Sequence, residues 1–374
     1  MAPSIVKPTT HRSALITSAF CPLPSALRGR YTAPVQVTID GRPLVGRRTG
    51  IGVHTAEIAR RLAVEPPPLI ATHAAIADQE GLERCRFRVD AAPNGILWQQ
   101  LVLPRVATEG VLWGPHGTIP LRLKIPAVVT LHDFTSITMP GRHRLKTIAS
   151  FNLFIGRSLA MAARVAAVSQ AAAEEAIRGF GVPRSRITIV PNGVDEFFSP
   201  GGGGADDYIL FVGTLEPRKG LTDLLAAWEA LPAPRPRLVL CGDAGWGARL
   251  KHRAGVEVTG YVDRERLRAL YRGARAFVYP SRHEGFGIPP LEAMACGAAV
   301  VATRTGAIPD YAGDAALLVD PGDVQGLHSA LARLLGDAGL RRELGARAAE
   351  RASHYRWETS AATMTRLLEE AARG

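Results

Sequence analysis

Residues 281–297 read SRHEGFGIPPLEAMACG and hold two glutamates, Glu284 and Glu292, eight positions apart. The preceding RAFVYP predicts a buried strand. PLEAMAC predicts a helix, because proline is tolerated in a first helical turn and Gly297 is a good helix end. Glu284 is therefore expected on a loop at the carboxyl edge of a sheet, and Glu292 in the first helical turn. Carboxylates beside glycine amides suit a polyhydroxylated ligand, because acids accept hydrogen bonds from hydroxyls and amides donate them.

Each glutamate taken alone has a structural explanation. Glu292 would favour the amino end of its helix, and Glu284 would be a solvated loop residue. Two carboxylates in one short segment that also contains glycines and prolines favour a ligand-binding loop over these two structural explanations.

The chain around this loop alternates short apolar strands with helical stretches on both sides of GGGG (201–204). Four glycines do not belong to a stable element, so they predict a linker. The alternation predicts two doubly wound α/β domains with parallel sheets, whose ligands bind at the carboxyl ends of the strands. Strands are expected within residues 35–44, 126–133, 164–169, 187–195, 208–213, 237–242, 256–260, 275–280 and 298–303.

Domain boundaries follow from this alternation. The 374 residues, 47% of them hydrophobic, suffice for two domains with cores of their own. The first 30 residues make a poor signal peptide, so a disordered extension or a mis-set start is expected there. The expected parts are an extension over 1–34, a first domain over 35–200, a linker over 201–206, a second domain over 207–350 and a helix over 351–374 that packs back onto the first domain.

Composition limits the partners. The formal net charge is +11, which indicates nucleic acid, an anionic membrane or a phosphorylated substrate, or else a genome rich in arginine codons. Nucleic acid is not expected, because no nucleic-acid module signature is present. No apolar stretch reaches the roughly 18 residues that a membrane span needs. Scattered cysteines predict reduced thiols in a cytoplasmic protein: Cys21, Cys85, Cys241 and Cys296.

The segment 141–165 mixes basic and apolar side chains. It would form either a basic amphipathic surface for anionic lipid or a lipid-linked acceptor, or an ordinary domain helix with a solvated arginine face. The residues of interest are Arg142, Arg144, Lys146, Phe151, Leu153, Phe154, Ile155, Arg157 and Arg164.

The stretch EGFGIPPLE resembles the E-x7-E signature of retaining GT-B glycosyltransferases, especially glycosyltransferase family four (group 1). Four other motifs are similar to segments of the same family, and the resemblance runs from about residue 36 to the end. They are IDGRPLVGRRTGIG (39–52), LHD (131–133), VPNGVD (190–195) and FVGTLEPRKG (211–220). The overall pattern most resembles mannosyltransferase-like members.

The resemblance implies a GT-B fold, with two Rossmann-like domains that face a central cleft. The first domain would bind the acceptor and the second the nucleotide sugar. Glu292 would accept hydrogen bonds from the ribose hydroxyls, and Glu284 would contact the transferred sugar. The residues implied in transfer are Glu284, His132, Arg218 and Lys219, with the last two holding the diphosphate. The donor contacts implied are Gly50, Gly52, Gly213, Gly285, Phe286, Gly287, Ile288, Glu292, Tyr261 and Val262, and Asp133 would contact the acceptor.

Simpler explanations exist for several of these residues. Arg218 and Lys219 would form a solvated turn, His132 would be a satisfied histidine at a strand end, and Gly50 and Gly52 would only start a helix. Two other enzyme classes fit poorly. The segment at Gly50 lacks the third glycine of a dinucleotide fingerprint, and the residues after Glu284 lack the second histidine of a zinc hydrolase.

The implied reaction is transfer of a hexose, with mannose favoured, from a nucleotide diphosphate sugar such as GDP-mannose to a glycan or lipid-linked acceptor. The anomeric configuration would be retained by same-face attack, with the leaving phosphate taking the acceptor proton. No metal or cofactor is expected, because cations and helix amino ends would stabilise the leaving group. The expected location is the cytoplasm, with peripheral contact to the inner face of the bacterial inner membrane. The alternative is a non-catalytic nucleotide-sugar-binding or scaffold protein of the same fold.

Overall fold

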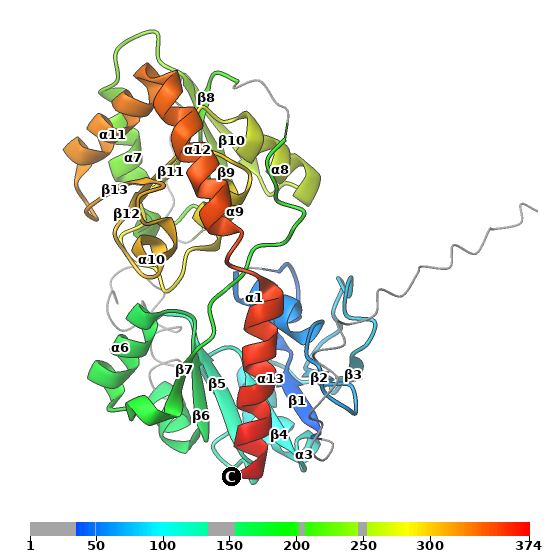
Figure 1. Ribbon diagram of the computed structural model, residues 1–374. Coiled ribbons are helices and arrows are strands. Elements are labelled where there is room, and N and C mark those ends of the chain that lie inside the picture. Colours follow the sequence, from blue (N-terminus) through cyan, green and yellow to red (C-terminus); the bar gives the residue numbers. More distant parts are fainter. Residues whose placement is uncertain (1–34, 49, 134–153, 202–205, 246–252) are drawn as a thin grey trace, which may run out of the picture. The chain divides into compact units, whose positions relative to one another are not determined.

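The computed structural model describes residues 35–48, 50–133, 154–201, 206–245 and 253–374. These residues form two parallel sheets, each flanked by helices (Figure 1). The seven-stranded sheet has the order β3-β2-β1-β4-β5-β6-β7, and the six-stranded sheet has the order β10-β9-β8-β11-β12-β13. The prediction of two parallel-sheet α/β domains is confirmed.

The first sheet is built from short strands whose central members are completely buried. All residues of β1, β4 and β5 are buried, as expected for strands covered on both faces. The strands are β1 (Val37–Asp40), β2 (Leu69–Thr72), β3 (Arg86–Val89), β4 (Val111–Gly114), β5 (Ala127–Leu131), β6 (Arg164–Ala167) and β7 (Ile187–Ile189). The helical elements are η2 (Arg42–Leu44), α1 (Gly50–Ala59), α2 (Gly95–Leu101), α3 (Leu103–Val106), a helix over 154–161, α6 (Gln170–Phe180) and η4 (Arg184–Arg186).

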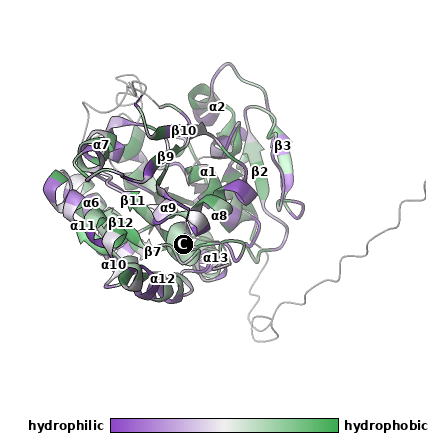
Figure 2. Cartoon of the chain, turned by 90° about the horizontal axis from the view of Figure 1, so that it is seen from above, coloured by the Kyte–Doolittle hydropathy of each residue, from purple (hydrophilic) through white to green (hydrophobic). Residues whose placement is uncertain are grey.

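The second sheet has the same construction. Figure 2 shows β11 and β12 in mainly hydrophobic colours, and every residue of both strands is buried. The strands are β8 (Tyr208–Val212), β9 (Arg237–Cys241), β10 (Val256–Gly260), β11 (Ala276–Tyr279), β12 (Val300–Thr303) and β13 (Leu317–Val319). The helical elements are η5 (Pro217–Lys219), α7 (Leu221–Glu229), α8 (Arg264–Gly273), α9 (Ile288–Ala295), α10 (Ile308–Ala312), α11 (Val324–Gly336), α12 (Ala338–Ala352) and α13 (Trp357–Arg373).

Four strands were missed by the sequence analysis. Three of them, β2, β3 and β4, occupy a region where only helical stretches were expected, and β13 is the fourth. Each has three or four residues, too few for a clear alternation of apolar and polar positions. The edge strand β3 reads RFRV and is largely exposed, so arginines hide its strand character.

The strand order reverses once in each sheet, between β1 and β4 and between β8 and β11. At such a switch point the connections leave in opposite directions and open a crevice at the carboxyl ends of the strands. The loops after β1 and β4 therefore define one candidate binding position, and the loops after β8 and β11 define another.

The last helix, α13, packs on the first sheet. Its buried side chains Trp357, Met364 and Leu368 share a hydrophobic cluster with Val37 and Val111 of that sheet. A Cβ atom on Gly193 would overlap the backbone nitrogen of Trp357, so the chain approaches the start of α13 closely after β7. The C-terminal residues thus complete the core of the domain that begins the described chain.

Several expectations fall wholly or partly outside the described residues. These are the extension over 1–34, most of the glycine linker, Cys21, and Arg142, Arg144, Lys146, Phe151 and Leu153 of the basic amphipathic segment. Within the described part of that segment, Ile155 is fully buried in the core, so it does not belong to an exposed apolar surface. The other cysteines, Cys85, Cys241 and Cys296, are buried free thiols. The described helices include none with the length and hydrophobicity needed to cross a bilayer.

The packing of α13 predicts a measurable loss of stability in Leu368→Ala. Leu368 is fully buried, so truncation removes apolar contacts and leaves a cavity, at an expected cost of about 2–5 kcal/mol in the free energy of unfolding. Urea unfolding followed by tryptophan fluorescence would measure this change. Arg366→Ala, an exposed position on the same helix, is the control. Equal stability of the two variants would contradict the packing described here.

Candidate functional site

Glu284 lies at the centre of a buried polar cluster in the loop between β11 and α9. Its side chain is only 8% exposed. Its Oε1 atom accepts hydrogen bonds from Lys219 Nζ at 2.5 Å, Ser281 Oγ at 2.6 Å and the Tyr279 hydroxyl at 3.1 Å. The alternative of a solvated loop glutamate is therefore wrong.

The neighbours of Glu284 keep its carboxyl group ionised. Burial opposes ionisation, but the charges of Lys219 and Arg218, together with hydrogen bonds from Lys219 and Ser281, outweigh it and lower the pKa of Glu284. Three donors meet Oε1, whereas Oε2 has no hydrogen bond within the described part of the chain. The carboxylate thus has one oxygen held by the protein and one available to a ligand.

Arg218 and Lys219 lie in η5, between β8 and α7, at the switch point of the second sheet. Lys219 is 7% exposed, and the Arg218 Nε atom donates to Glu216 Oε2 at 2.9 Å. Arg218 Nη1 is buried and has no acceptor among the described residues, although Glu284 Oε1 lies 3.8 Å away. The alternative of a solvated turn is therefore wrong. A buried guanidinium with an unused donor is suited to binding an anion.

The loop glycines bring the backbone close to other groups. A Cβ atom on Gly285 would overlap the carbonyl oxygen of His132, so only glycine fits there. Gly287 has φ +84° and precedes α9, and its carbonyl accepts a hydrogen bond from the Tyr311 hydroxyl at 2.8 Å. Phe286 is buried, with its ring 5.3 Å from the Tyr311 ring. Across residues 285–288 the amides donate to no acceptor in the described structure, so they are available to a ligand.

Glu292 lies one turn further along α9 than expected. The helix begins at Ile288, so both prolines fall in its first turn, and Glu292 is its fifth residue. The expectation of a first-turn position is wrong, and favouring the helix amino end does not explain this residue. Its Oε2 atom accepts a hydrogen bond from the Tyr271 hydroxyl at 2.8 Å. Burial raises the pKa of Glu292 to about 7, and the Tyr271 hydrogen bond offsets part of that shift.

His132 follows β5, and its ring is held on two sides. Nε2 lies 2.9 Å from the Pro115 carbonyl, so this nitrogen carries the proton and donates, which leaves Nδ1 as an acceptor. The ring packs at 90° against the ring of His54, with centroids 4.8 Å apart. Burial lowers the pKa of His132, and the Pro115 hydrogen bond opposes this. The alternative of a histidine whose ring nitrogens are both satisfied at a strand end accounts for Nε2, which has a partner. It does not account for Nδ1, which has no hydrogen bond among the described residues.

Comparison with known proteins gives the family. Residues 195–351 match the model for "Glycosyl transferases group 1", and residues 103–196 match the model for "Glycosyltransferase Family 4". The chain is 31% identical over 369 residues to the O-antigen chain mannosyltransferase B of Escherichia coli, and the match covers 87% of this chain and 97% of that protein.

The chain belongs to the group 1 glycosyltransferases.

Other comparisons agree with this membership. A D-inositol 3-phosphate glycosyltransferase of Xylanimonas cellulosilytica is 30% identical over 412 residues, which cover 92% of this chain and 96% of that protein. The solved structure of Anabaena Alr3699/HepE in complex with UDP-glucose has a TM-score of 0.74 at 21% identity, and the match covers 90% of this chain and all of that one. The structure of WaaG, a glycosyltransferase involved in lipopolysaccharide biosynthesis, has a TM-score of 0.69 at 16% identity, with 89% and 99% covered. The predicted GT-B fold and glycosyltransferase family are confirmed.

The remaining predicted residues lie in more varied surroundings. In this glycosyltransferase, Asp133 lies near the cations of the second domain, and its charge helps to raise the pKa of Arg218 against the effect of burial. Tyr261 is 60% exposed under the guanidinium of Arg47 at 5.0 Å, and Val262 beside it is half-buried. Gly213 has φ +149° directly after β8.

The two predicted glycines of the first domain differ in whether packing requires them. Gly50 begins α1, and a Cβ atom on it would meet nothing within 4 Å. A Cβ atom on Gly52 would lie 2.6 Å from the carbonyl oxygen of Pro43, so Gly52 permits close packing of α1 on η2. Close packing thus explains Gly52 without a ligand, nothing in the described structure requires glycine at position 50, and the contact of both glycines with the donor stays a prediction.

Two buried residues beside the site were missed by the sequence analysis. His54 is completely buried in α1, and its Nδ1 atom lies 2.7 Å from Asn192 Oδ1. Burial lowers the pKa of His54 to about 3, so its ring is neutral and supports His132 through the ring contact. Asn192 lies within the motif VPNGVD. A polar residue at the end of an apolar strand was the signal from which its role could have been predicted.

The raised pKa of Glu292 predicts a pH dependence of stability. The folded state holds the proton of Glu292 up to about pH 7, whereas an unfolded glutamate releases it near pH 4.5. The free energy of unfolding should therefore fall by about 1–3 kcal/mol as the pH rises from about 4.5 to 7, and level off above that. Glu292→Gln should lack this fall in urea unfolding at several pH values. Glu343→Gln, at an exposed glutamate, is the control, and parallel profiles for Glu292→Gln and wild type would contradict the assignment.

Proposed function

We propose that this glycosyltransferase transfers a mannosyl residue, with retention of configuration, from GDP-mannose to a hydroxyl of a glycan or lipid-linked acceptor in the synthesis of a cell-surface polysaccharide. The observation that carries the proposal is the buried Glu284, held by Lys219 at 2.5 Å beside Arg218 Nη1, which has no hydrogen-bond acceptor among the described residues. Similarity to the O-antigen chain mannosyltransferase B over 87% of the chain supports the sugar and the kind of product.

The donor would bind across the switch point of the second sheet. The diphosphate would accept hydrogen bonds from Arg218 Nη1, and the positive charge of Lys219 would stabilise its negative charge. The ribose hydroxyls would donate to Glu292, and the exposed ring of Tyr261 is the candidate for contact with the base. The transferred sugar would lie against Glu284 Oε2 and the amides of residues 285–287, which donate to no acceptor in the described part of the chain.

Breaking the bond between the anomeric carbon and the diphosphate oxygen is the difficult step. Positive charge grows on the sugar and negative charge on the leaving phosphate. A guanidinium and an ammonium that are already buried and oriented stabilise the phosphate without rearrangement during the reaction. The carboxylate of Glu284 would lie on the sugar side, where its negative charge would stabilise the growing positive charge.

Retention would follow from attack on the same face as departure. The acceptor hydroxyl would attack the anomeric carbon beside the leaving phosphate, and that phosphate would take the hydroxyl proton. His132 Nδ1 is an acceptor and would hold a sugar hydroxyl in position. Glu284 is not expected to act as a nucleophile, because two cations and two hydroxyl groups lower its basicity.

The proposed partners are the nucleotide diphosphate sugar and the acceptor, with no nucleic acid. We place the enzyme in the cytoplasm, in peripheral contact with the inner face of the bacterial inner membrane, where lipid-linked acceptors are found. The non-catalytic alternative is less well supported, because the polar cluster of Glu284, Lys219 and Arg218 is intact and the curated relatives named above are transferases.

A donor screen tests this function. Purified protein with GDP-mannose, GDP-fucose, UDP-glucose or UDP-galactose should release nucleoside diphosphate fastest from GDP-mannose. Arg218→Gln should lower kcat by about 10²–10³-fold, the usual effect of removing one donor to a developing charge. Nucleotide release and mass spectrometry of the product measure the reaction, and NMR of the product's anomeric proton reports retention.

Arg304→Gln is the matched control, because this arginine is 56% exposed and its weak ion pair with Asp320 spans 3.7 Å. Thermal unfolding of both variants shows whether each is folded. If Arg218→Gln is folded and as active as the control, the assigned diphosphate site is wrong. If the wild-type protein binds a donor but releases no nucleotide with any acceptor, the result supports the non-catalytic alternative instead.

Chelation tests the expected metal independence separately. Turnover of GDP-mannose should change less than about twofold when EDTA is added, because two protein cations would neutralise the leaving phosphate. Loss of turnover that Mg²⁺ or Mn²⁺ restores would contradict this expectation. It would leave the assignment of the sugar untouched.

A further inference from the structure

A cavity of about 750 Å³ lies in the first domain, at the switch point between β1 and β4. Arg42 follows β1, His73 follows β2 and His116 follows β4, so all three come from the carboxyl edge of the sheet, where β5 also presents His132. The full lining is Arg42, Pro43, Val45, Arg47, His73, Asn94, Gly95, Ile96, Leu97 and His116.

The polar lining of this cavity can donate to an anion. Two arginines, two histidines and one asparagine face it, and no carboxylate does among the described residues. A site built for neutral sugars normally includes carboxylates, which accept hydrogen bonds from hydroxyl groups. Arginine and histidine donors in a lining without carboxylates instead match phosphate oxygens. Both arginines also have an acidic partner outside the lining, Asp40 for Arg42 and Asp243 for the exposed Arg47, so Arg42 Nη1 and the histidines are the main donors.

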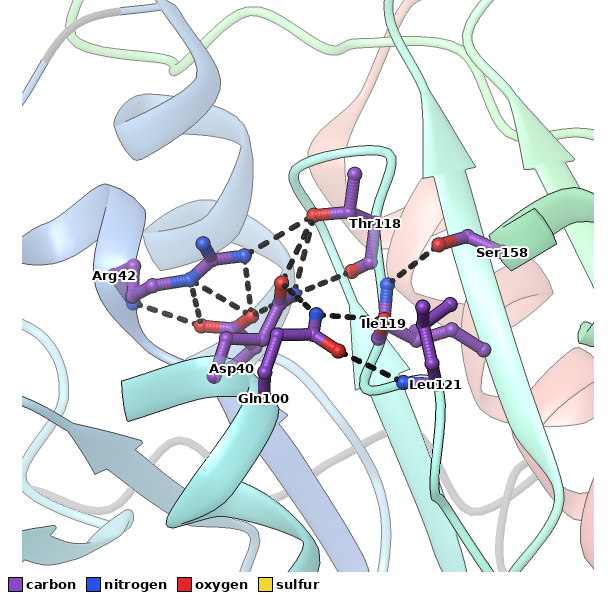
Figure 3. Close-up of polar contacts among 8 residues, drawn as sticks. Asp40, Arg42, Gln100, Thr118, Ile119, Leu121 and Ser158 are labelled. Atoms are coloured by element: carbon purple, nitrogen blue, oxygen red, sulfur yellow. Dashed lines mark hydrogen bonds and ion pairs between the residues drawn. The ribbon is translucent and has the colours of Figure 1, made fainter. Parts of the chain in front are cut away.

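Arg42 is fixed in place before any ligand arrives. Its Nε and Nη2 atoms donate to the buried Asp40 at 2.8–3.0 Å, and Nη2 also lies 3.2 Å from Thr118 Oγ1 (Figure 3). Gln99 of α2 donates to both Asp40 and Thr118. Nη1 takes no part in this network, and the Arg42 side chain is 11% exposed. Asp40 balances part of the positive charge of Arg42, but its carboxylate contacts Nε and Nη2, on the side of the guanidinium away from Nη1.

Apolar side chains adjoin the donors at one edge of the cavity. Ile96 and Leu97 line it and are 40% and 48% exposed, and Leu101 on the same helix is 55% exposed. Helix α2 is held in place by Gln99 and Gln100, which donate to the backbone carbonyl groups of Thr118 and Ile119 (Figure 3). Its exposed side chains are therefore presented by a fixed helix rather than by a loop.

We propose that this cavity binds a phosphate-bearing part of the acceptor, with the adjoining apolar chain lying along Ile96, Leu97 and Leu101. The inference rests on the proposed function and chooses between its two acceptor classes. It assigns an acceptor in which the sugar is linked through phosphate to a lipid, rather than a free neutral glycan.

Calorimetric titration tests the site without relying on turnover. Geranyl diphosphate, inorganic diphosphate and geraniol are the probes, so that the amphiphile, the anion and the apolar chain are measured separately. Geranyl diphosphate should bind more tightly than either of the others. His116→Glu should weaken its binding about tenfold by placing a like charge in the cavity, and Leu97→Ser about fivefold by removing apolar contact. Arg42 is left unchanged, because its loss would leave Asp40 buried without a counterion.

The controls locate the bound anion. His354→Glu makes the same change at an exposed histidine far along the chain and should leave binding unchanged. Arg218→Gln should also keep geranyl diphosphate bound, because that arginine belongs to the donor site. The proposal is overturned by loss of binding in Arg218→Gln with retention in His116→Glu. It is equally overturned by absence of binding to wild type, or by inorganic diphosphate binding as tightly as the amphiphile. A failure of the proposed function would appear instead as absence of donor turnover, which this titration does not use.

Discussion

The site depends on one buried ionic contact, between the carboxylate of Glu284 and the ammonium of Lys219. A lone charge in either position would be costly, because both side chains are almost completely removed from water. Their contact joins the loop after β11 to the turn after β8, which are the two loops that flank the switch point of the second sheet. Among the described residues, Glu284 Oε2 and Arg218 Nη1 have no hydrogen-bond partner. The interaction that holds the loops together therefore also leaves them able to bind a ligand.

Both sheets use their switch points in related ways. After β8 and β11 the chain presents two cations and a carboxylate, and after β1 and β4 it presents Arg42 and His116 at a cavity. In each case an arginine is held by a carboxylate two positions before it, Glu216 or Asp40, and its Nη1 atom donates no hydrogen bond to a described residue. This arrangement gives a fixed donor at low conformational cost, which suits phosphate recognition at both positions.

The fold class was predictable from the alternation of apolar strands and helices, and the family from the motif around Glu284 together with four other motifs. The burial of Lys219 was harder to predict from the sequence, because a lysine next to a glycine is equally typical of an exposed turn. The predicted position of Glu292 in the first helical turn was wrong, because the sequence analysis did not recognise Ile288 as the first residue of the helix. The contacts of His54 and Arg42 could not be predicted, because their partners Asn192 and Thr118 lie 138 and 76 residues away in the sequence. The cavity could not be predicted either, because His73 and His116 follow β2 and β4, two strands that the sequence analysis missed. Tertiary contacts between distant segments leave little trace in local periodicity.

The contact between Gly285 and the carbonyl oxygen of His132 has a consequence for how the enzyme tolerates change. The loop that would carry the sugar rests on a backbone atom of the residue that would touch the same sugar. The contact between these two elements is thus made by backbone atoms and does not involve the side chain at position 132. Position 285 is restricted to glycine, because a single added carbon would push the two elements apart. Variation in this family member can therefore alter the chemistry at 132 while the spacing set at 285 stays constant.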